Sequence, residues 1–190
     1  MRRIVLLLAT TALTLLVTSG VAVAVNKIGT NGPDTLRGTN AADKLVGGSG
    51  NDRLYALAGQ DTLLGGPGKD IVSGGDLRDP FRGNKNLVGG RGNDAVFGGF
   101  GSDNIVGESG SDYMFDAGGK DLMLGGGGAD FIDANDGFGD RISCGAGSDK
   151  VIFDRRLDIV AADCESRHPA PGVPVAFGTW FCSHFPRLCK

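Results

Sequence analysis

Aspartate and glycine are the residues whose spacing in this sequence could do chemistry. From Gly89 to Asp130 the chain reads GGRGNDAVF, GGFGSDNIV, GESGSDYMF, DAGGKDLML and GGGGAD, in units of nine residues. Glycine favours the first, second and fourth places of a unit, and aspartate takes the sixth. Glycine lets a backbone turn tightly and approach a ligand closely. Because carbonyl and carboxylate oxygens are the ligands that Ca²⁺ takes, six to eight at a time, the pattern predicts calcium-sized cation sites in the turns.

The aspartate column runs through most of the chain. Its members are Asp34, Asp43, Asp52, Asp61, Asp70, Asp79, Asp94, Asp103, Asp112, Asp121, Asp130, Asp140, Asp149 and Asp158. Residues 83–88 form a shortened unit in which Lys85 stands where aspartate is expected, and its ammonium group can replace a cation there. The sequence has twenty aspartates and only two glutamates. A solvated acidic face would use both residues, so this excess favours sites that need a short carboxylate at a fixed point.

Large apolar residues fill the eighth place of every unit. They are Leu36, Leu45, Leu54, Leu63, Val72, Phe81, Leu87, Val96, Ile105, Met114, Met123, Ile132, Ile142, Val151 and Val160. Side chains alternate between the two faces of a strand, so a six-residue turn followed by a three-residue strand would point this residue inward. One unit cannot bury its apolar residue alone, and stacked units can. The column therefore predicts an all-β solenoid with two units in each coil, and it argues against a disordered Gly/Asp linker.

The units over residues 29–161 match G-G-x-G-x-D-x-U-x and resemble the RTX, or haemolysin-type, calcium-binding repeat. The resemblance implies a right-handed parallel β-roll with several calcium ions held between the turns of successive coils. The best turns are 47–52, 65–70, 89–94, 98–103 and 125–130, and weaker turns are 56–61, 107–112, 116–121 and 144–149. The turns before Asp43 and Asp79 lack the needed glycines, which argues against calcium there, and residues 153–158 are expected to close the roll.

The metal ligands that the resemblance implies are glycines and sixth-place aspartates of these turns. They are Gly47, Gly50, Asp52, Asp61, Gly65, Gly68, Asp70, Gly89, Gly92, Asp94, Gly98, Gly101, Asp103, Gly110, Asp112, Gly119, Asp121, Gly125, Gly128, Asp130, Asp140 and Asp149. Asp136 lies off the column. We therefore expect its loss to weaken calcium binding less than the loss of Asp103 or Asp121.

The first 24 residues have the pattern of a secretory signal. Arg2 and Arg3 precede an apolar run, and Ala22-Val23-Ala24 offers an A-x-A cleavage site, so the mature chain is expected to begin at Val25 and to be secreted. An uncleaved membrane anchor is the alternative. A cleaved signal would leave no membrane span. Classical secreted toxins and proteases with this repeat usually lack such a signal, and the chain looks more like the calcium-binding repeat proteins that actinobacteria export by the general pathway.

Four cysteines lie near the carboxyl end. One coil of 18 residues after Cys144 is Ala162, two residues before Cys164. Stacked coils lie ~4.8 Å apart, within the Cα separation that a disulfide accepts, so we predict the pairs Cys144–Cys164 and Cys182–Cys189. Residues 162–190 would form a cap and an irregular tail with Pro, aromatic and Cys residues. A tail that docks on a partner, or a zinc site from Cys182, His184 and Cys189, are the alternatives.

Several classes of function find no support in the composition. The formal charge of −3 offers no basic surplus for nucleic acid. No H-E-x-x-H, G-x-S-x-G or G-K-[ST] motif occurs, and the repeat leaves no room for a catalytic domain. The sequence therefore predicts a non-catalytic calcium-binding protein. Two alternatives stay open: a module that adheres to the cell envelope or to an extracellular partner, and an accessory fragment of a secreted toxin or enzyme.

Overall fold

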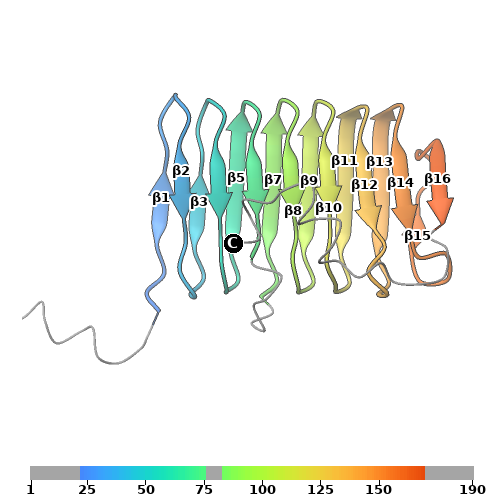
Figure 1. The fold of residues 1–190 in the computed structure, drawn as a ribbon, viewed down its shortest axis with the longest axis horizontal. Coiled ribbons are helices and arrows are strands. Elements are labelled where there is room, and N and C mark those ends of the chain that lie inside the picture. The colour runs from blue at the N-terminus through green and yellow to red at the C-terminus, as the bar shows by residue number, and fades with distance from the viewer. Residues whose placement is uncertain (1–21, 76–82, 170–190) are drawn as a thin grey trace, which may run out of the picture.

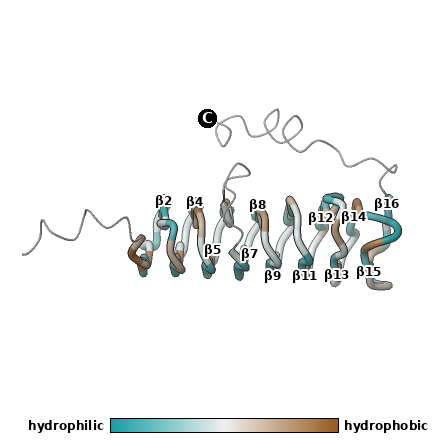
Figure 2. The backbone as a smooth tube through the Cα atoms, turned by 90° about the horizontal axis from the view of Figure 1, so that it is seen from below, coloured by the Kyte–Doolittle hydropathy of each residue, from teal (hydrophilic) through white to brown (hydrophobic). Residues whose placement is uncertain are grey.

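Two parallel β-sheets, wound from a single chain, form a solenoid of about eight turns (Figure 1). The structure is a computed structural model that describes residues 22–75 and 83–169. Within these ranges it contains sixteen strands and no helix. Consecutive strands lie in opposite sheets, so the backbone zigzags between the layer of even-numbered strands and the layer of odd-numbered strands (Figure 2). The all-β, parallel solenoid expected from the repeat is confirmed.

The strands divide into an odd sheet and an even sheet. The odd sheet holds β1 (Asn26–Ile28), β3 (Lys44–Val46), β5 (Thr62–Pro67), β7 (Asn86–Arg91), β9 (Asn104–Ser109), β11 (Leu122–Gly128), β13 (Arg141–Gly147) and β15 (Ile159–Val160). The even sheet holds β2 (Thr35–Arg37), β4 (Arg53–Tyr55), β6 (Ile71–Ser73), β8 (Ala95–Phe97), β10 (Tyr113–Phe115), β12 (Phe131–Ala134), β14 (Lys150–Phe153) and β16 (Ser166–Pro169).

The apolar column forms the core, as predicted. Twelve of its fifteen positions are buried between the sheets, and eleven of them are completely inaccessible: Leu45, Leu54, Leu63, Val72, Leu87, Val96, Ile105, Met114, Met123, Ile132 and Val151. Ile142 is 2% exposed. Leu36 and Val160 are half-buried because they belong to the outermost coils, and Phe81 lies outside the described residues. Each core residue therefore packs on its equivalents in the coils before and after it.

The strand register sets one coil apart from the rest. Most strands pair at an offset of 18 residues, as Leu45 with Leu63 does. Across the interval between β6 and β7 the offset is 24, because Thr62 pairs with Asn86 and Ile71 with Ala95. The sequence reading divides this interval into a regular unit and a shortened one. In the structure, this interval is instead one turn with six additional residues. As a result, Lys85 is stacked directly between Asp61 and Asp103 of the neighbouring coils.

Several strands are longer than the three residues expected from the repeat. β5, β7, β9, β11 and β13 contain six or seven residues and continue into the glycines of the next turn. Gly66 pairs with Gly90, and Gly126 with Gly145. Glycine has no side chain to hold stacked turns apart, so the backbones of these turns stay close enough to continue the ladder.

The carboxyl end of the solenoid extends beyond residue 161. β16 pairs with β14 and adds one more strand to the even sheet. Cys144 and Cys164 form the predicted disulfide, with a Cα separation of 5.1 Å. Both cysteines are buried, so the bond ties the last coils together from inside. The second predicted pair, Cys182–Cys189, lies outside the described residues, as do residues 1–21 of the signal segment. Among the described residues we find no helix of the length and apolar character that crossing a membrane requires.

The second place of most turns has a left-handed backbone. Gly90 has φ 119° and Gly126 has φ 115°, and the same conformation is forced on two other residues, Leu57 at φ 76° and Glu108 at φ 79°. A Cβ in the left-handed region costs roughly 1–2 kcal/mol. Glu108 is exposed, so its side chain contributes no core packing to offset this cost.

Replacing Glu108 by glycine is expected to stabilise the protein. Glu108→Gly removes the Cβ at φ 79°, whereas Glu108→Ala removes the charge and keeps the Cβ. In saturating calcium, the glycine variant should be about 1 kcal/mol more stable than the alanine variant, which corresponds to a melting temperature ~2–4 °C higher for a chain of this size. Thermal melts followed by circular dichroism measure the difference. Equal melting temperatures for the two variants would show that the turn is not strained.

Candidate metal centre

The six-residue turns form two stacked rows, one at each edge of the two sheets (Figure 1). Row one precedes the even-sheet strands, and its sixth places are Asp34, Asp52, Asp70, Asp94, Asp112, Asp130 and Asp149. Row two precedes the odd-sheet strands, and its sixth places are Asp43, Asp61, Lys85, Asp103, Asp121, Asp140 and Asp158. Within each row, residues that are one coil apart in the sequence are therefore stacked next to one another.

Each carboxylate in a row has one oxygen bound to the coil before it. Oδ1 of Asp94 accepts a hydrogen bond from the backbone N–H of Asp70 at 2.8 Å, and Oδ1 of Asp112 accepts one from Asp94 at the same distance. In row two, Oδ1 of Asp103 accepts from the N–H of Lys85 at 2.8 Å. This bond fixes the orientation of the carboxyl group and directs its second oxygen toward the turn.

The second oxygen of ten of these aspartates is buried and has no hydrogen-bond partner. The ten are Asp52, Asp61, Asp70, Asp94, Asp103, Asp112, Asp121, Asp130, Asp140 and Asp149. They are the same ten aspartates that the repeat resemblance implies as metal ligands. Because buried polar groups are nearly always paired, a repeated, identically oriented set of unpaired oxygens calls for a partner that the protein chain itself does not supply.

Glycine at the first place creates the space in which that partner fits. A Cβ added to Gly89 would lie 2.7 Å from Oδ2 of Asp94 and 3.1 Å from the carbonyl oxygen of Gly107 in the next coil. A Cβ on Gly65 would likewise meet Oδ2 of Asp70 and the carbonyl oxygen of Gly89. The space beside these two glycines is therefore bounded by a carboxylate oxygen and a backbone carbonyl oxygen, and Gly47, Gly107 and Gly125 have equivalent surroundings. This donor set fits a hard cation such as Ca²⁺, and it offers no nitrogen or sulfur for zinc or copper.

Three sixth-place aspartates of the described residues, Asp34, Asp43 and Asp158, have no buried oxygen that lacks a partner. Oδ2 of Asp34 accepts hydrogen bonds from the N–H and hydroxyl of Thr30, at 2.6 and 2.8 Å. Oδ2 of Asp43 is bound in the same way by Thr39. Asp158 uses one oxygen for the N–H of Asp140 and the other for that of Asp154. In these three turns the chain itself therefore supplies the partner of Oδ2. The expectation against calcium at Asp43 stays a prediction, and Asp79 lies outside the described residues.

Lys85 occupies the sixth place of row two with a positive charge. Its side chain is 3% exposed, and its Nζ donates a hydrogen bond to the carbonyl oxygen of Gly83 at 3.0 Å. The ammonium group lowers the pKa of Asp61 and Asp103, in opposition to the larger effect of burial. Lys85 therefore supplies within the chain part of the positive charge that this row requires.

Burial makes the charged form of the open aspartates unfavourable. It raises the pKa of Asp94 to about 7, and the neighbouring charges of Asp70 and Asp112 add to the rise. Burial also raises the pKa of Asp103 to about 7 and the pKa of Asp61 and Asp112 to about 6. Without a bound cation, the rows thus hold carboxyl groups that take up protons near neutral pH.

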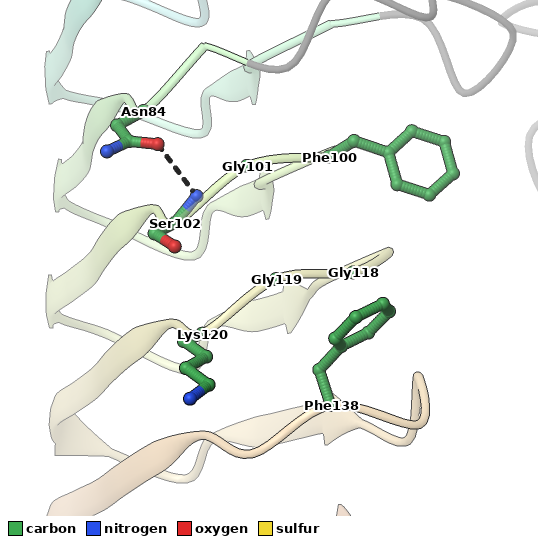
Figure 3. Close-up of a pocket in the computed structure, with 8 residues that line it drawn as sticks. All are labelled: Asn84, Phe100, Gly101, Ser102, Gly118, Gly119, Lys120 and Phe138. Carbon is green, nitrogen blue, oxygen red and sulfur yellow. Dashed lines mark hydrogen bonds between the residues drawn. The ribbon is translucent and has the colours of Figure 1, made fainter.

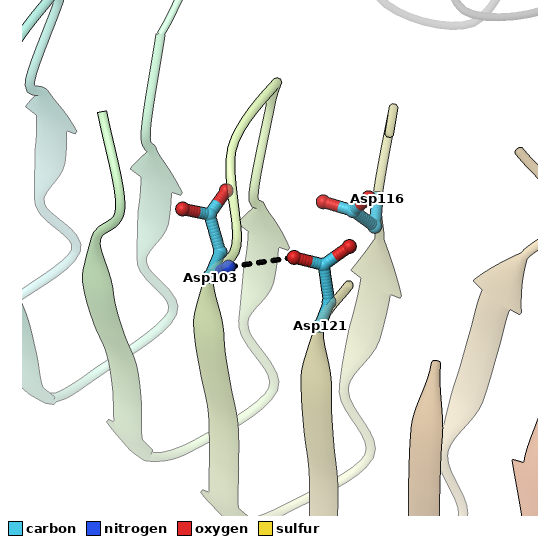
Figure 4. A group of neighbouring side chains, drawn as sticks. All are labelled: Asp103, Asp116 and Asp121. Carbon is cyan, nitrogen blue, oxygen red and sulfur yellow. Dashed lines mark hydrogen bonds between the residues drawn. The ribbon is translucent and has the colours of Figure 1, made fainter. Parts of the chain in front are cut away.

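Two aspartates outside the column join row two. Asp116 occupies the first place of its turn, and one of its oxygens lies within 4.8 Å of a carboxylate oxygen of Asp103 and one of Asp121 (Figure 4). Asp136 makes a second such group with Asp121 and Asp140. Two unit charges at that separation repel by about 3–4 kcal/mol at an effective dielectric of 20. Asp136 therefore lies inside the row, and the structure does not support treating it as remote from the metal site.

The sequence contained only a weak signal for these two residues. Asp116 stands where the repeat has glycine, and Asp136 lies in the unit that contains one extra residue, so neither follows the sixth-place pattern. For Asp116, the available sign was an oxygen-bearing side chain at a place where the repeat has glycine. Only the stacking of the coils shows that both carboxylates point into the row.

The turns of row two also border a pocket of about 340 Å³ (Figure 3). Phe100 and Phe138 flank Gly118, where an added Cβ would meet both rings at 3.2–3.4 Å. Asn84, Ser102 and Lys120 provide the polar part of the lining. Lys120 is the only side chain in this lining that carries a charge, so the pocket contains no acid–base pair of the kind that general acid–base catalysis uses.

Comparison with known proteins identifies the repeat. A family model of the RTX calcium-binding nonapeptide repeat, which spans four copies of the unit, matches residues 28–63, 46–79, 82–114, 107–140 and 115–151. Together these matches cover more than half of the chain and include all ten aspartates with an unpaired oxygen. No curated protein matches the chain. The parallel solenoid, the two rows of turns and the family match agree, and the chain belongs to the family of RTX calcium-binding nonapeptide repeat proteins.

Proposed function

We propose that this protein is a secreted, non-catalytic calcium-binding β-roll in which several Ca²⁺ ions between the turns drive folding and hold the coils together. The observation that carries the proposal is the set of ten buried carboxylate oxygens without a partner. In five turns of row one, this oxygen and a backbone carbonyl oxygen of the next coil both border the space beside the first-place glycine. Calcium would supply the positive charge that balances the rows and would link one coil to the next.

Secretion is supported by the amino-terminal pattern and by the disulfide. Disulfides persist in oxidising compartments outside the cytoplasm, and Cys144–Cys164 is buried at the end of the roll.

Two matched aspartate variants test the calcium sites. Asp94 and Asp43 are both sixth-place residues that are 3% exposed. Asp94 has an unpaired oxygen, whereas both oxygens of Asp43 accept hydrogen bonds from the chain. Asp94→Asn should therefore weaken calcium binding at its site at least tenfold, since affinity follows the number of charged ligands. Asp43→Asn should leave the number and affinity of bound ions unchanged.

Isothermal titration of each variant with calcium provides the measurement, and circular dichroism in saturating calcium confirms that the variants are folded. Equal weakening by both substitutions would mean that the sixth-place aspartates act only as turn caps. Unchanged binding in Asp94→Asn would remove this turn from the set of calcium sites.

A further inference from the structure

Of the two carboxylates that row two contains beyond the repeat pattern, Asp116 and Asp136, Asp116 is the more deeply buried. Asp116 is completely buried, and its Oδ1 has no hydrogen-bond partner. Its Oδ2 accepts a hydrogen bond from the N–H of Gly118 at 2.7 Å, and its own N–H donates to the carbonyl oxygen of Asp133 at 3.1 Å. Hydrogen bonds thus fix both the backbone N–H of Asp116 and its Oδ2. Its Oδ1 is directed toward the carboxylate oxygens of Asp103 and Asp121 (Figure 4).

Asp116 takes the position that a neutral oxygen has in the other turns. A Cβ on Gly89 or Gly65 would meet the carbonyl oxygen of the first-place glycine in the next coil. A Cβ on Gly98 would instead meet Oδ1 of Asp116 first, and Oδ2 of Asp103 at 3.2 Å. The space beside Gly98 therefore has an anionic oxygen where its counterparts have a carbonyl. Two sixth-place carboxylates and Asp116 give this space three negative groups, one more than a regular pair of turns provides.

We propose that Asp103, Asp116 and Asp121 form a calcium site of higher affinity than the regular turns, which fills first and begins the ordering of the roll. This inference rests on the proposed function, because Asp103 and Asp121 belong to the repeat sites. Calcium affinity in proteins rises with the number of charged ligands and with the rigidity of the site. Asp116 adds to both, since it contributes a carboxylate whose orientation is already fixed by the N–H of Gly118. We expect this site to bind Ca²⁺ at least about tenfold more tightly than the other sites.

Calcium binding to the purified protein and three variants tests the inference. Asp116→Asn keeps the shape of the side chain and removes the charge. Asp116→Gly restores the first-place glycine of a regular turn, so it serves as a second variant if the asparagine side chain disturbs folding. Asp112→Asn is the matched control, because Asp112 belongs to row one, is 3% exposed and has an unpaired oxygen with no additional carboxylate. Ions bound per chain are counted by atomic emission after dialysis against calcium buffers of stepped concentration.

The unmodified protein and Asp112→Asn should each retain one ion at a calcium concentration about tenfold below that at which the other ions bind. Both Asp116 variants should lose this separate first ion, so that all of their ions bind in the higher concentration range. A single class of ions in the unmodified protein, or a first ion that survives in both Asp116 variants, would overturn the inference and leave the proposed function intact. Failure of the unmodified protein to bind calcium at any concentration would overturn both.

Discussion

Removing calcium should abolish most of the strand structure of this protein. Ten buried carboxylate oxygens without partners, and rows of like charges stacked coil upon coil, oppose the folded state when no cation is bound. A single pair of such charges at ~4.8 Å costs about 3–4 kcal/mol at an effective dielectric of 20, and a whole domain is stable by only ~5–15 kcal/mol. The 34 glycines add a large entropic cost, because glycine loses more conformational freedom on folding than any other residue.

Circular dichroism of the purified protein during a calcium titration measures this effect. We expect an unfolded spectrum in calcium-free buffer and a cooperative gain of strand signal at roughly 10⁻⁴–10⁻³ M calcium, the range of extracellular calcium modules. Magnesium is the control, since it demands shorter, near-octahedral coordination and should not replace calcium at these turns. A strand signal that is identical with and without calcium would disprove the role of calcium in folding.

Acidification should act on the calcium-free protein in the opposite direction to ordinary acid denaturation. Burial raises the pKa of Asp94 and Asp103 to about 7 in the folded state, from the ordinary value of 3.8. The folded state therefore binds more protons than the unfolded chain between these pH values, and its stability rises as pH falls. The destabilising effect of each group is fully present above pH ~7 and has disappeared below pH ~4. Calcium-free protein should consequently gain strand signal between pH 8 and pH 5.

Calcium-loaded protein should respond in the reverse sense. Protons compete with the metal for the same carboxylates, so the calcium concentration needed for folding should increase as pH falls. Circular dichroism spectra between pH 8 and pH 5, in buffers freed of calcium by dialysis and not by a pH-sensitive chelator, measure the gain of strand signal in the calcium-free protein.

Two aspartate variants locate the groups responsible for this pH dependence. Asp94→Asn should reduce it, because the substitution removes a carboxyl whose pKa is raised. Asp34→Asn should not reduce it, since the hydrogen bonds from Thr30 lower the pKa of Asp34. Calcium-free protein that loses strand signal on acidification would contradict the proposal that the unpaired carboxylates destabilise it.

The sequence alone determined the architecture and most of the candidate metal positions. The units repeat one turn and one strand, so a contact between coils joins residues about 18 positions apart, except across the interval between β6 and β7. The period therefore fixes which residues stack, as the pairing of Leu45 with Leu63 and the disulfide Cys144–Cys164 show. It also placed the ten aspartates that have unpaired oxygens, because side chains at equivalent places of a solenoid have equivalent surroundings.

Tertiary structure alone decided where the repeat is broken. Asp34 and Asp43 have the right spacing, but only the coordinates show that Thr30 and Thr39 satisfy their second oxygens. The register across the interval between β6 and β7 depends on which strands pair, and the pairing of β5 with β7 is what places Lys85 in row two. Asp116 entered the metal centre against the motif, because the direction of its carboxyl group is set by a local hydrogen bond from Gly118. A periodic pattern states which residues are neighbours, whereas hydrogen bonding and side-chain direction decide which of their oxygens are left for a cation.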